Sequence, residues 1–207
     1  MSENIFRYFP SLSGRQIEQL SELQQIYERW NRMINVISRK DMDNFMVHHL
    51  LYSMAIAKIT SFVPKTRILD VGTGGGFPGI PLAIMFPDAE FTLLDSIEKK
   101  IKVVSAVAGE LELKNVIPLR KRVEDEKGKY HYIISRAVTE FQGFVRLTLK
   151  NIDNTQINSL KNGIIYLKGG DLSDESAMYK KKLTIWDIKD FFSEPFFETK
   201  KIIHLTL

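Results

Sequence analysis

A glycine-rich turn is the part of the sequence best suited to chemistry. Residues 68–79 read ILDVGTGGGFPG, a short apolar run that leads into a turn with five glycines. Glycine adopts positive φ and lets the backbone approach a ligand closely, while Pro78 suits the first turn of a following helix. Turns of this kind bind nucleotide-like cofactors at the end of a strand. The pattern therefore predicts a cofactor site that includes Gly72 and Gly74.

Two acids help to identify the cofactor. Residues 74–79 also satisfy the G-x-G-x-x-G pattern, so a nicotinamide cofactor is an alternative. Asp70 ends the first apolar run, where methyltransferases commonly place an acid that faces the methionine amino group, and it favours S-adenosyl-L-methionine. Asp95 ends the second run, where a carboxylate can accept hydrogen bonds from both ribose hydroxyls of either cofactor. A tight turn with two helix-capping acids and no ligand is the weaker reading.

The elements that position these residues form an alternating pattern. Short apolar runs alternate with helical segments from residue 67 onward, which is typical of a parallel α/β sheet. These runs are 68–71, 91–94, 116–119, 132–135 and 164–167. Two further runs, 183–188 and 201–207, are separated by a short connection at Ser193–Pro195 and predict an antiparallel pair at the sheet edge. We predict a Rossmann-like class I methyltransferase fold with a seven-stranded, mostly parallel sheet.

Two amphipathic helices precede the glycine turn. Ser13 and Gln16 form a capping box, and apolar residues follow at helical spacing as far as Ile34. A second helix is expected from about Asp43 to Ile59, ending before Pro64. We expect a helical extension over residues 1–63 that packs on a methyltransferase domain over residues 64–207, as one structural unit.

Composition limits the class of protein. The chain has 207 residues, a formal net charge of +4 and no cysteine. The absence of cysteine excludes disulfides, a thiolate metal site and a cysteine nucleophile, and we predict no metal site. The first ten residues lack a signal-peptide pattern, and the longest apolar stretch, 80–86, is too short to span a bilayer. We expect a soluble cytoplasmic protein, without membrane contact, whose mild positive charge permits a nucleic-acid partner.

Several separated blocks resemble the RsmG (GidB) family of bacterial 16S rRNA guanine-N7 methyltransferases, over about residues 30–168. The most specific is the FPGIP tail of the glycine turn, residues 77–81. The other blocks are, in order, 30–31, 35–39, 49–54, 94–96 with 99–100, 122–124, 135–138 and 168–169. One departure concerns the family's His-x-x-Asp-Ser-Leu segment, in which Tyr52 replaces the acid.

The resemblance implies an activity and a set of site residues. It implies methyl transfer from S-adenosyl-L-methionine to N7 of a guanine in 16S rRNA, guanine 527 in the customary rRNA numbering. It implies cofactor contacts at Gly72 and Phe77 in the turn and at Val123 and Glu124, beside the adenine. From composition alone, Glu124 would be taken as part of a solvated acidic loop. Arg136 is implied near the transfer site, and it is the one residue that we expect to act in catalysis.

The residues that are missing narrow the chemistry. Methylation of cytosine C5 needs a cysteine nucleophile. Methylation of exocyclic base amines usually needs an Asn/Asp-Pro-Pro-aromatic loop after the fourth strand, where this chain reads SRAV at 135–138. Guanine N7 carries a lone pair and no proton, so it can attack a methyl donor without a general base. The sequence is compatible with that acceptor, with Arg136 orienting the guanine or a phosphate.

Other features are assigned more weakly. His48 and His49 are expected to point to different faces of a helix, and we call neither catalytic. Basic residues at 29, 32, 39 and 40, at 99, 100 and 102, and at 120–122 are candidates for contact with 16S rRNA or the small ribosomal subunit, while the run Lys180–Lys182 is unexplained. We expect a monomer. A nicotinamide-dependent reductase and a non-catalytic ribosome-binding protein both stay open as alternatives.

Overall fold

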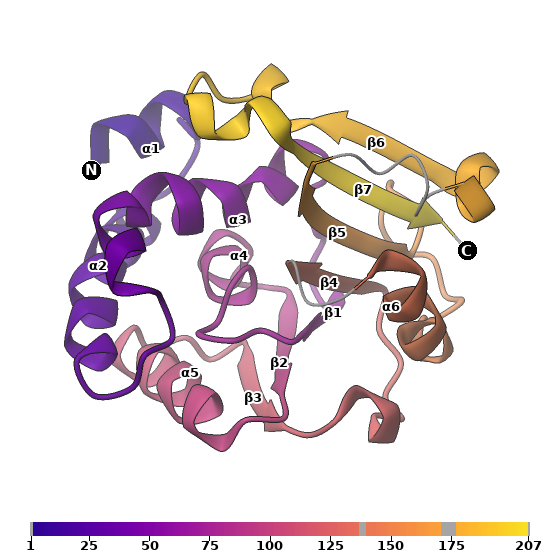
Figure 1. Cartoon of the computed structure of the whole chain (residues 1–207), viewed down its shortest axis with the longest axis horizontal. Coiled ribbons are helices and arrows are strands. Elements are labelled where there is room, and N and C mark those ends of the chain that lie inside the picture. Colours follow the sequence, from indigo (N-terminus) through magenta and orange to yellow (C-terminus); the bar gives the residue numbers. More distant parts are fainter. Residues whose placement is uncertain (1, 137–139, 171–176, 207) are drawn as a thin grey trace.

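The computed structural model describes residues 2–136, 140–170 and 177–206, which build a seven-stranded sheet (Figure 1). Its strands are β1 (Arg67–Val71), β2 (Glu90–Asp95), β3 (Val116–Arg120), β4 (Tyr132–Arg136), β5 (Gly163–Gly169), β6 (Leu183–Asp187) and β7 (Lys200–Thr206). The spatial order is β3-β2-β1-β4-β5-β7-β6. Strands β1 to β5 pair in parallel, and β7 pairs antiparallel with both β5 and β6. The predicted fold, with its antiparallel pair at the edge, is confirmed.

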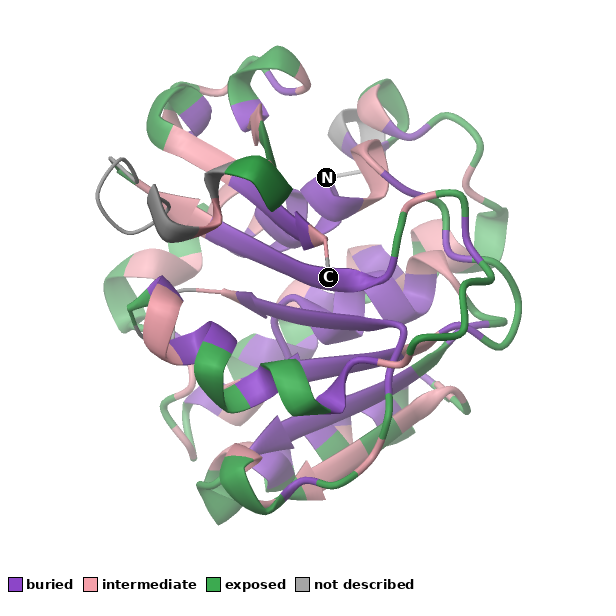
Figure 2. Ribbon diagram, turned by 90° about the vertical axis from the view of Figure 1, so that its right-hand side faces the viewer, coloured by how far each residue is buried: buried purple, intermediate pink, exposed green. Residues whose placement is uncertain are grey.

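Helices cover both faces of the sheet. The α-helices are α1 (Ser2–Tyr8), α2 (Gly14–Asn31), α3 (Tyr52–Met54), α4 (Gly79–Met85), α5 (Glu98–Glu110) and α6 (Phe141–Thr148). Neighbouring strand residues point to opposite faces, so Ile68 packs in the core with α2, α4 and α5 while Leu69 packs in the core with α6. The strands β1, β4 and β5 are buried over most of their length, as Figure 2 shows, and most of their side chains are apolar.

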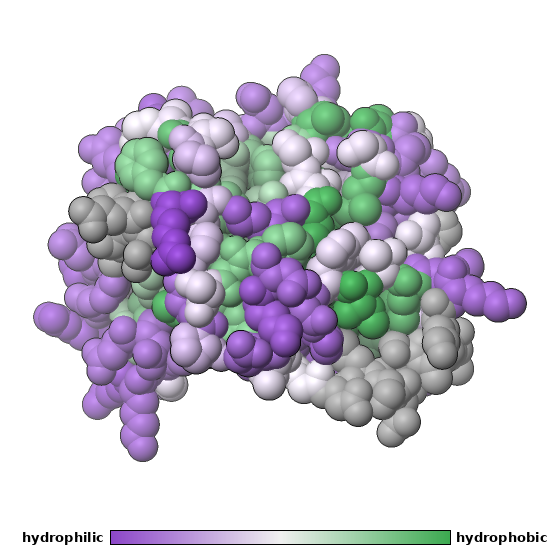
Figure 3. Space-filling model, turned by 90° about the horizontal axis from the view of Figure 1, so that it is seen from above, coloured by the Kyte–Doolittle hydropathy of each residue, from purple (hydrophilic) through white to green (hydrophobic). Residues whose placement is uncertain are grey.

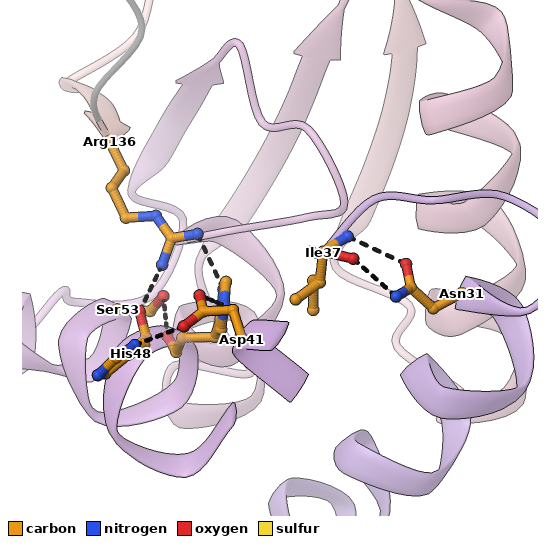
Figure 4. Close-up of polar contacts among 7 residues, drawn as sticks. Asn31, Ile37, Asp41, His48, Ser53 and Arg136 are labelled. Atoms are coloured by element: carbon orange, nitrogen blue, oxygen red, sulfur yellow. Dashed lines mark hydrogen bonds and ion pairs between the residues drawn. The ribbon is translucent and has the colours of Figure 1, made fainter. Parts of the chain in front are cut away.

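The first predicted helix is confirmed at its start and is shorter than expected at its end. Ser13 and Gln16 form the capping box of α2. The helix ends at Asn31, because the Asn31 side chain binds the chain that follows: its Oδ1 accepts from the amides of Val36 (2.8 Å) and Ile37 (3.0 Å), and its Nδ2 donates to the Ile37 carbonyl (2.7 Å; Figure 4). Ile34 therefore lies in a loop.

The second predicted helix, 43–59, is not a single α-helix. The chain forms a 3-10 turn η1 (Arg39–Asn44), a π-helical segment η2 (Phe45–Leu51), the short α3 and a further 3-10 turn η3 (Ala55–Lys58). The apolar spacing of the sequence does not separate these helix types, because tertiary contacts select among them. Wide π turns are frequent at functional sites.

The connection between the last two strands also differs from the prediction. Two 3-10 turns, η7 (Ile188–Asp190) and η8 (Pro195–Thr199), stand between β6 and β7, so the link is longer than Ser193–Pro195. Seen from above, the face that carries these elements mixes hydrophilic and hydrophobic side chains (Figure 3). Among the described residues, no helix is both long and apolar enough to cross a membrane.

Candidate active site

A cavity of about 420 Å³ opens at the carboxyl ends of β1, β2 and β4. Strand order reverses between β1 and β4, and in open parallel sheets ligands bind at this switch point. The cavity brings together five of the predicted catalytic and cofactor-binding residues: Gly72, Asp95, Val123, Glu124 and Arg136. These residues span 65 positions of the chain, from 72 to 136, and only the fold makes them neighbours.

The glycine turn has the backbone that only glycine adopts readily. Gly72, Gly74 and Gly76 have φ of 68°, 59° and 106°. The hydroxyl of the buried Tyr27 donates to the carbonyl of Gly75 at 2.6 Å, so helix α2 holds the turn from behind. Burial raises the pKa of Tyr27 well above its usual value, which keeps this donor protonated. The sequence predicted Tyr27 only as an apolar position of a helix, because its hydroxyl contact is remote in the chain.

Asp95 is tied to the turn as well as to the cavity. Its Oδ2 accepts the amide of Gly74 at 3.1 Å and lies 3.5 Å from Nζ of Lys100, and its Oδ1 accepts the amide of Ile97 at 2.9 Å. The side chain is 6% exposed, yet it lines the cavity. A carboxylate has further lone pairs for hydroxyl donors, so Asp95 can accept from a ligand in the cavity while it also holds the turn.

Asp70 binds the glycine turn through one of its two carboxylate oxygens. Its Oδ2 accepts from the Thr73 hydroxyl (2.6 Å) and from the amide of Gly79 at the start of α4 (2.9 Å), and the carboxyl group is fully buried behind the turn. Burial raises the pKa of Asp70 to about 7, although both hydrogen bonds act against this rise. Asp70 is absent from the cavity lining within the described chain. Its Oδ1 has no hydrogen-bond partner among the described residues, and the contact with the methionine amino group stays a prediction.

The opposite wall of the cavity comes from the short turn η4 (Val123–Asp125), which follows β3. Val123 is partly buried and Glu124 is exposed. Two lysines add positive charge to the lining, Lys100 beside Asp95 and Lys121, whose Nζ lies 3.0 Å from Glu126. The wall thus offers one apolar side chain between charged groups.

Arg136 ends β4 and reaches across to the helical extension. Its Nη1 donates to the carbonyl of His48 at 2.9 Å, and its Nη2 lies 3.1 Å from Nδ1 of His49 (Figure 4). The guanidinium also lies over the rings of Phe77 (5.4 Å) and Tyr52 (5.8 Å). Phe77 itself is buried and packs on Tyr27, so the structure shows it supporting Arg136 and the turn rather than lining the cavity.

The two histidines do not point to different faces, contrary to our prediction. Nδ1 of His48 and Nε2 of His49 both lie 2.6 Å from the carboxylate of Asp41, one ring on each oxygen. Partial burial raises the pKa of Asp41, but these hydrogen bonds outweigh it and hold the pKa below the usual value. Sequence reasoning missed Asp41 because it lies in the 3-10 turn η1, outside any recognised pattern.

Some residues that the sequence analysis singled out lie outside this cavity or outside the described part of the chain. Lys181 and Lys182 line a separate hollow with Lys161, at the amino end of β5, away from the candidate site. The side chain of Lys180 lies outside the described part, as do Ala137 and Val138 of the SRAV block. Within the described residues, no group of three or more His, Asp or Glu side chains is placed to hold a metal ion.

Solved structures with the same arrangement of strands and helices are methyltransferases. Magnesium protoporphyrin IX methyltransferase from Synechocystis, solved with bound SAM, superposes with a TM-score of 0.59 over 91% of this chain and 97% of that chain, at 15% identity. The 16S rRNA N2 G1207 methyltransferase of T. thermophilus superposes with a TM-score of 0.56 over 76% of this chain and 42% of that chain, at 14% identity. These likenesses establish the fold.

Relatives found by sequence comparison have a much higher identity to this chain. Ribosomal RNA small subunit methyltransferase G of Flavobacterium johnsoniae is 52% identical over 99% of this chain and 98% of its own length. The protein of that name from Phocaeicola vulgatus is 48% identical over the same shares. The family model described as rRNA small subunit methyltransferase G matches residues 16–203. This chain therefore belongs to the rRNA small subunit methyltransferase G family.

Proposed function

We propose that this protein transfers a methyl group from S-adenosyl-L-methionine to N7 of a guanine in 16S rRNA. The observation that carries the proposal is the cavity at the switch point of the sheet, where the glycine turn, Asp95, Val123, Glu124 and Arg136 meet. Family membership supports the RNA substrate, since relatives of about 50% identity are named as small subunit rRNA methyltransferases.

The residues around the cavity suit this cofactor. Gly72 offers backbone without a side chain, Asp95 offers a carboxylate for ribose hydroxyls, and Val123 and Ile97 offer apolar surface for a base. The volume of about 420 Å³ is in the range of small-molecule sites. When bound, the cofactor supplies an electrophilic methyl group on a sulfonium ion.

The protein's own part in the reaction would be positioning. Guanine N7 has a free lone pair, so no side chain has to remove a proton before methyl transfer. Holding N7 in line with the methyl group can contribute on the order of 7–11 kcal/mol to lowering the barrier. Arg136, with a planar fork of donors at the edge of the cavity, is suited to hold the guanine or a phosphate. Burial lowers the pKa of Arg136, but an arginine still carries its charge near neutral pH.

The basic residues that we predicted to contact RNA lie on the end of α2 and the turn after it, on α5, and on the end of β3 and the residues that follow it. Several predicted cations are engaged by acids: Arg29 pairs with Glu110, and Arg120 pairs with Glu98. Of the predicted cations, those that are exposed and have no carboxylate partner in the described part of the chain are Arg32, Arg39, Lys40, Lys99, Lys102 and Arg122. We assign the RNA phosphate contacts to this second group, so binding should weaken as salt rises.

Two measurements test the proposal. Calorimetric titration should show binding of S-adenosylhomocysteine and none of NADH, and tight binding of NADH alone would make the protein a nucleotide-dependent reductase instead. The protein should then be incubated with methyl-labelled S-adenosyl-L-methionine and either small ribosomal subunits or 16S rRNA. Each protein molecule should transfer many methyl groups to the RNA. Cofactor binding without any turnover on either substrate would identify a non-catalytic ribosome-binding protein.

A further inference from the structure

The guanidinium of Arg136 is held by two acceptors on one helical segment. Nη1 donates to the carbonyl of His48, and Nη2 donates to Nδ1 of His49, both within η2. Arginine has donors only, so Nδ1 of His49 must be the acceptor in the second contact. A neutral imidazole that accepts at Nδ1 carries its proton on Nε2.

The second nitrogen of His49 confirms this assignment. Nε2 lies 2.6 Å from Oδ2 of Asp41, and a carboxylate accepts hydrogen bonds, so the Nε2 proton points at Asp41. The three groups form a directed chain in which Asp41 accepts from His49 and His49 accepts from Arg136. Burial, followed by the charge of Arg136, lowers the pKa of His49 to about 4, which agrees with a neutral ring.

The residues of this hydrogen-bond chain lie on segments that other contacts hold in place. Asn31 closes the loop before η1, the turn that carries Asp41 (Figure 4). His49 is 7% exposed and packs on the rings of Phe45 and Phe77. Each partner of Arg136 is therefore itself held in place.

We propose that Asp41 and His49 are positioning residues for methyl transfer: Asp41 fixes the His49 ring with its proton on Nε2, and Nδ1 of that ring fixes the Arg136 guanidinium at the cavity. The inference rests on the proposed function, because Arg136 is taken to orient the substrate. A side-chain hydrogen bond that aligns a catalytic group typically acts on turnover rather than on ligand affinity.

A pair of substitutions at His49 separates positioning from other roles. His49→Phe keeps a ring against Phe45 and Phe77 but removes the acceptor, and it should lower kcat about 10- to 100-fold with the affinity for S-adenosylhomocysteine unchanged. His49→Asn places an amide oxygen near the position of Nδ1 and should recover most of that loss. If the two variants are equally inactive, His49 is itself the acid or base and the positioning role is wrong. If both match the wild type in kcat, the role is also wrong.

A double-mutant cycle tests whether Asp41 acts through His49. Asp41→Ala alone should lower kcat about tenfold. Adding it to His49→Phe should have no further effect, because His49→Phe already breaks the hydrogen-bond chain from Asp41 to Arg136. Exposed Asp43, two positions along the same turn, gives the matched control Asp43→Ala, which should leave kcat unchanged. Additive losses in the double variant would show that Asp41 does not act through His49.

A readout that needs no RNA keeps this inference distinct from the proposed function. Nitrogen-15 NMR of the histidine rings in the wild type should show His49 neutral at pH 7, with its proton on Nε2. A proton on Nδ1 would contradict the proposed hydrogen bonds from Arg136 to His49 and from His49 to Asp41, whatever the substrate is. Failure of the wild type to methylate any RNA, with the Nε2 tautomer observed, would instead overturn the proposed function and with it the catalytic consequence of the chain.

Discussion

The backbone amide of Gly74 donates a hydrogen bond to Oδ2 of Asp95 at 3.1 Å. This bond joins the glycine turn after β1 to the carboxylate that ends β2, so the two parts of the predicted cofactor site are fixed relative to each other. The same carboxylate accepts the amide of Ile97 through Oδ1. Asp95 is thus oriented before any ligand binds, which reduces the entropy that binding has to overcome.

Replacing Asp95 by alanine should weaken cofactor binding. The loss of charge-assisted hydrogen bonds to a ligand costs roughly 1.5–3 kcal/mol, and the protein should stay folded because the strand keeps its backbone pairing. Titration of the variant with S-adenosylhomocysteine measures the change. Glu98→Ala removes an exposed acid nearby, paired only with Arg120 in the structure, and should leave the affinity unaltered. Unchanged affinity in Asp95→Ala would remove this residue from the site.

Arg136→Ala should reduce methyl transfer far more than it reduces stability. The substitution leaves the His48 carbonyl and the His49 ring without their donor, at a cost of about 1–3 kcal/mol in the free energy of unfolding. Turnover should fall by two orders of magnitude or more if the guanidinium aligns the guanine. Arg136→Lys keeps the charge without the planar fork and should recover stability better than activity. Activity that only follows the loss of folded protein would make Arg136 structural.

Much of the fold follows from local patterns. The capping box at Ser13, the apolar runs and the glycine turn each depend on neighbours in the chain, and all three predictions are confirmed. The cavity residues Gly72 and Asp95 could be predicted for the same reason, because each directly follows or ends a strand.

The features that the sequence did not predict share a different cause. Asp41 and His49 gain their roles from contacts with each other and with Arg136, 87 positions beyond His49. The end of α2 is likewise decided by the Asn31 side chain rather than by apolar spacing. Long-range hydrogen bonds of this kind leave no periodic signal in a sequence.

Two glycine substitutions should have opposite effects on stability. A Cβ at Gly79 would lie 2.8 Å from both Oδ2 of Asp70 and the Leu93 side chain, so Gly79→Ala should cost about 1–3 kcal/mol. A Cβ at Gly109, exposed in α5, meets nothing within 4 Å, and Gly109→Ala should be neutral or stabilise the protein by up to about 1 kcal/mol. Urea unfolding of both variants measures the difference. Equal effects of the two substitutions would contradict the close packing of α4 on β1 and β2.

Acid should weaken the fold through His49. Its pKa is about 4 in the folded protein and about 6.5 when unfolded, so the unfolded chain takes up a proton at a higher pH than the native protein. Stability is therefore lost as pH falls from about 6.5 toward 4, by at most on the order of 3 kcal/mol. Asp70, with a raised pKa, acts in the opposite direction over the same range, so the comparison is wild type against His49→Phe. The stability advantage of the wild type should shrink between pH 7 and 4.5, and a constant difference would mean that His49 is not buried as a neutral ring.

The central claim is the identity of the methylated atom, and chemical cleavage of the product RNA tests it most directly. Methylation at N7 places a positive charge on the imidazole ring of guanine, so borohydride followed by aniline should cut the RNA at the modified nucleotide. Small subunits from cells that lack the enzyme, and naked 16S rRNA beside them, should be incubated with the protein and S-adenosyl-L-methionine, with Arg136→Ala as the control. We predict one cleavage site, at guanine 527 of the 16S rRNA, that depends on the cofactor and is lost in the variant. Labelled methyl in the RNA without cleavage at a guanine would contradict the N7 assignment.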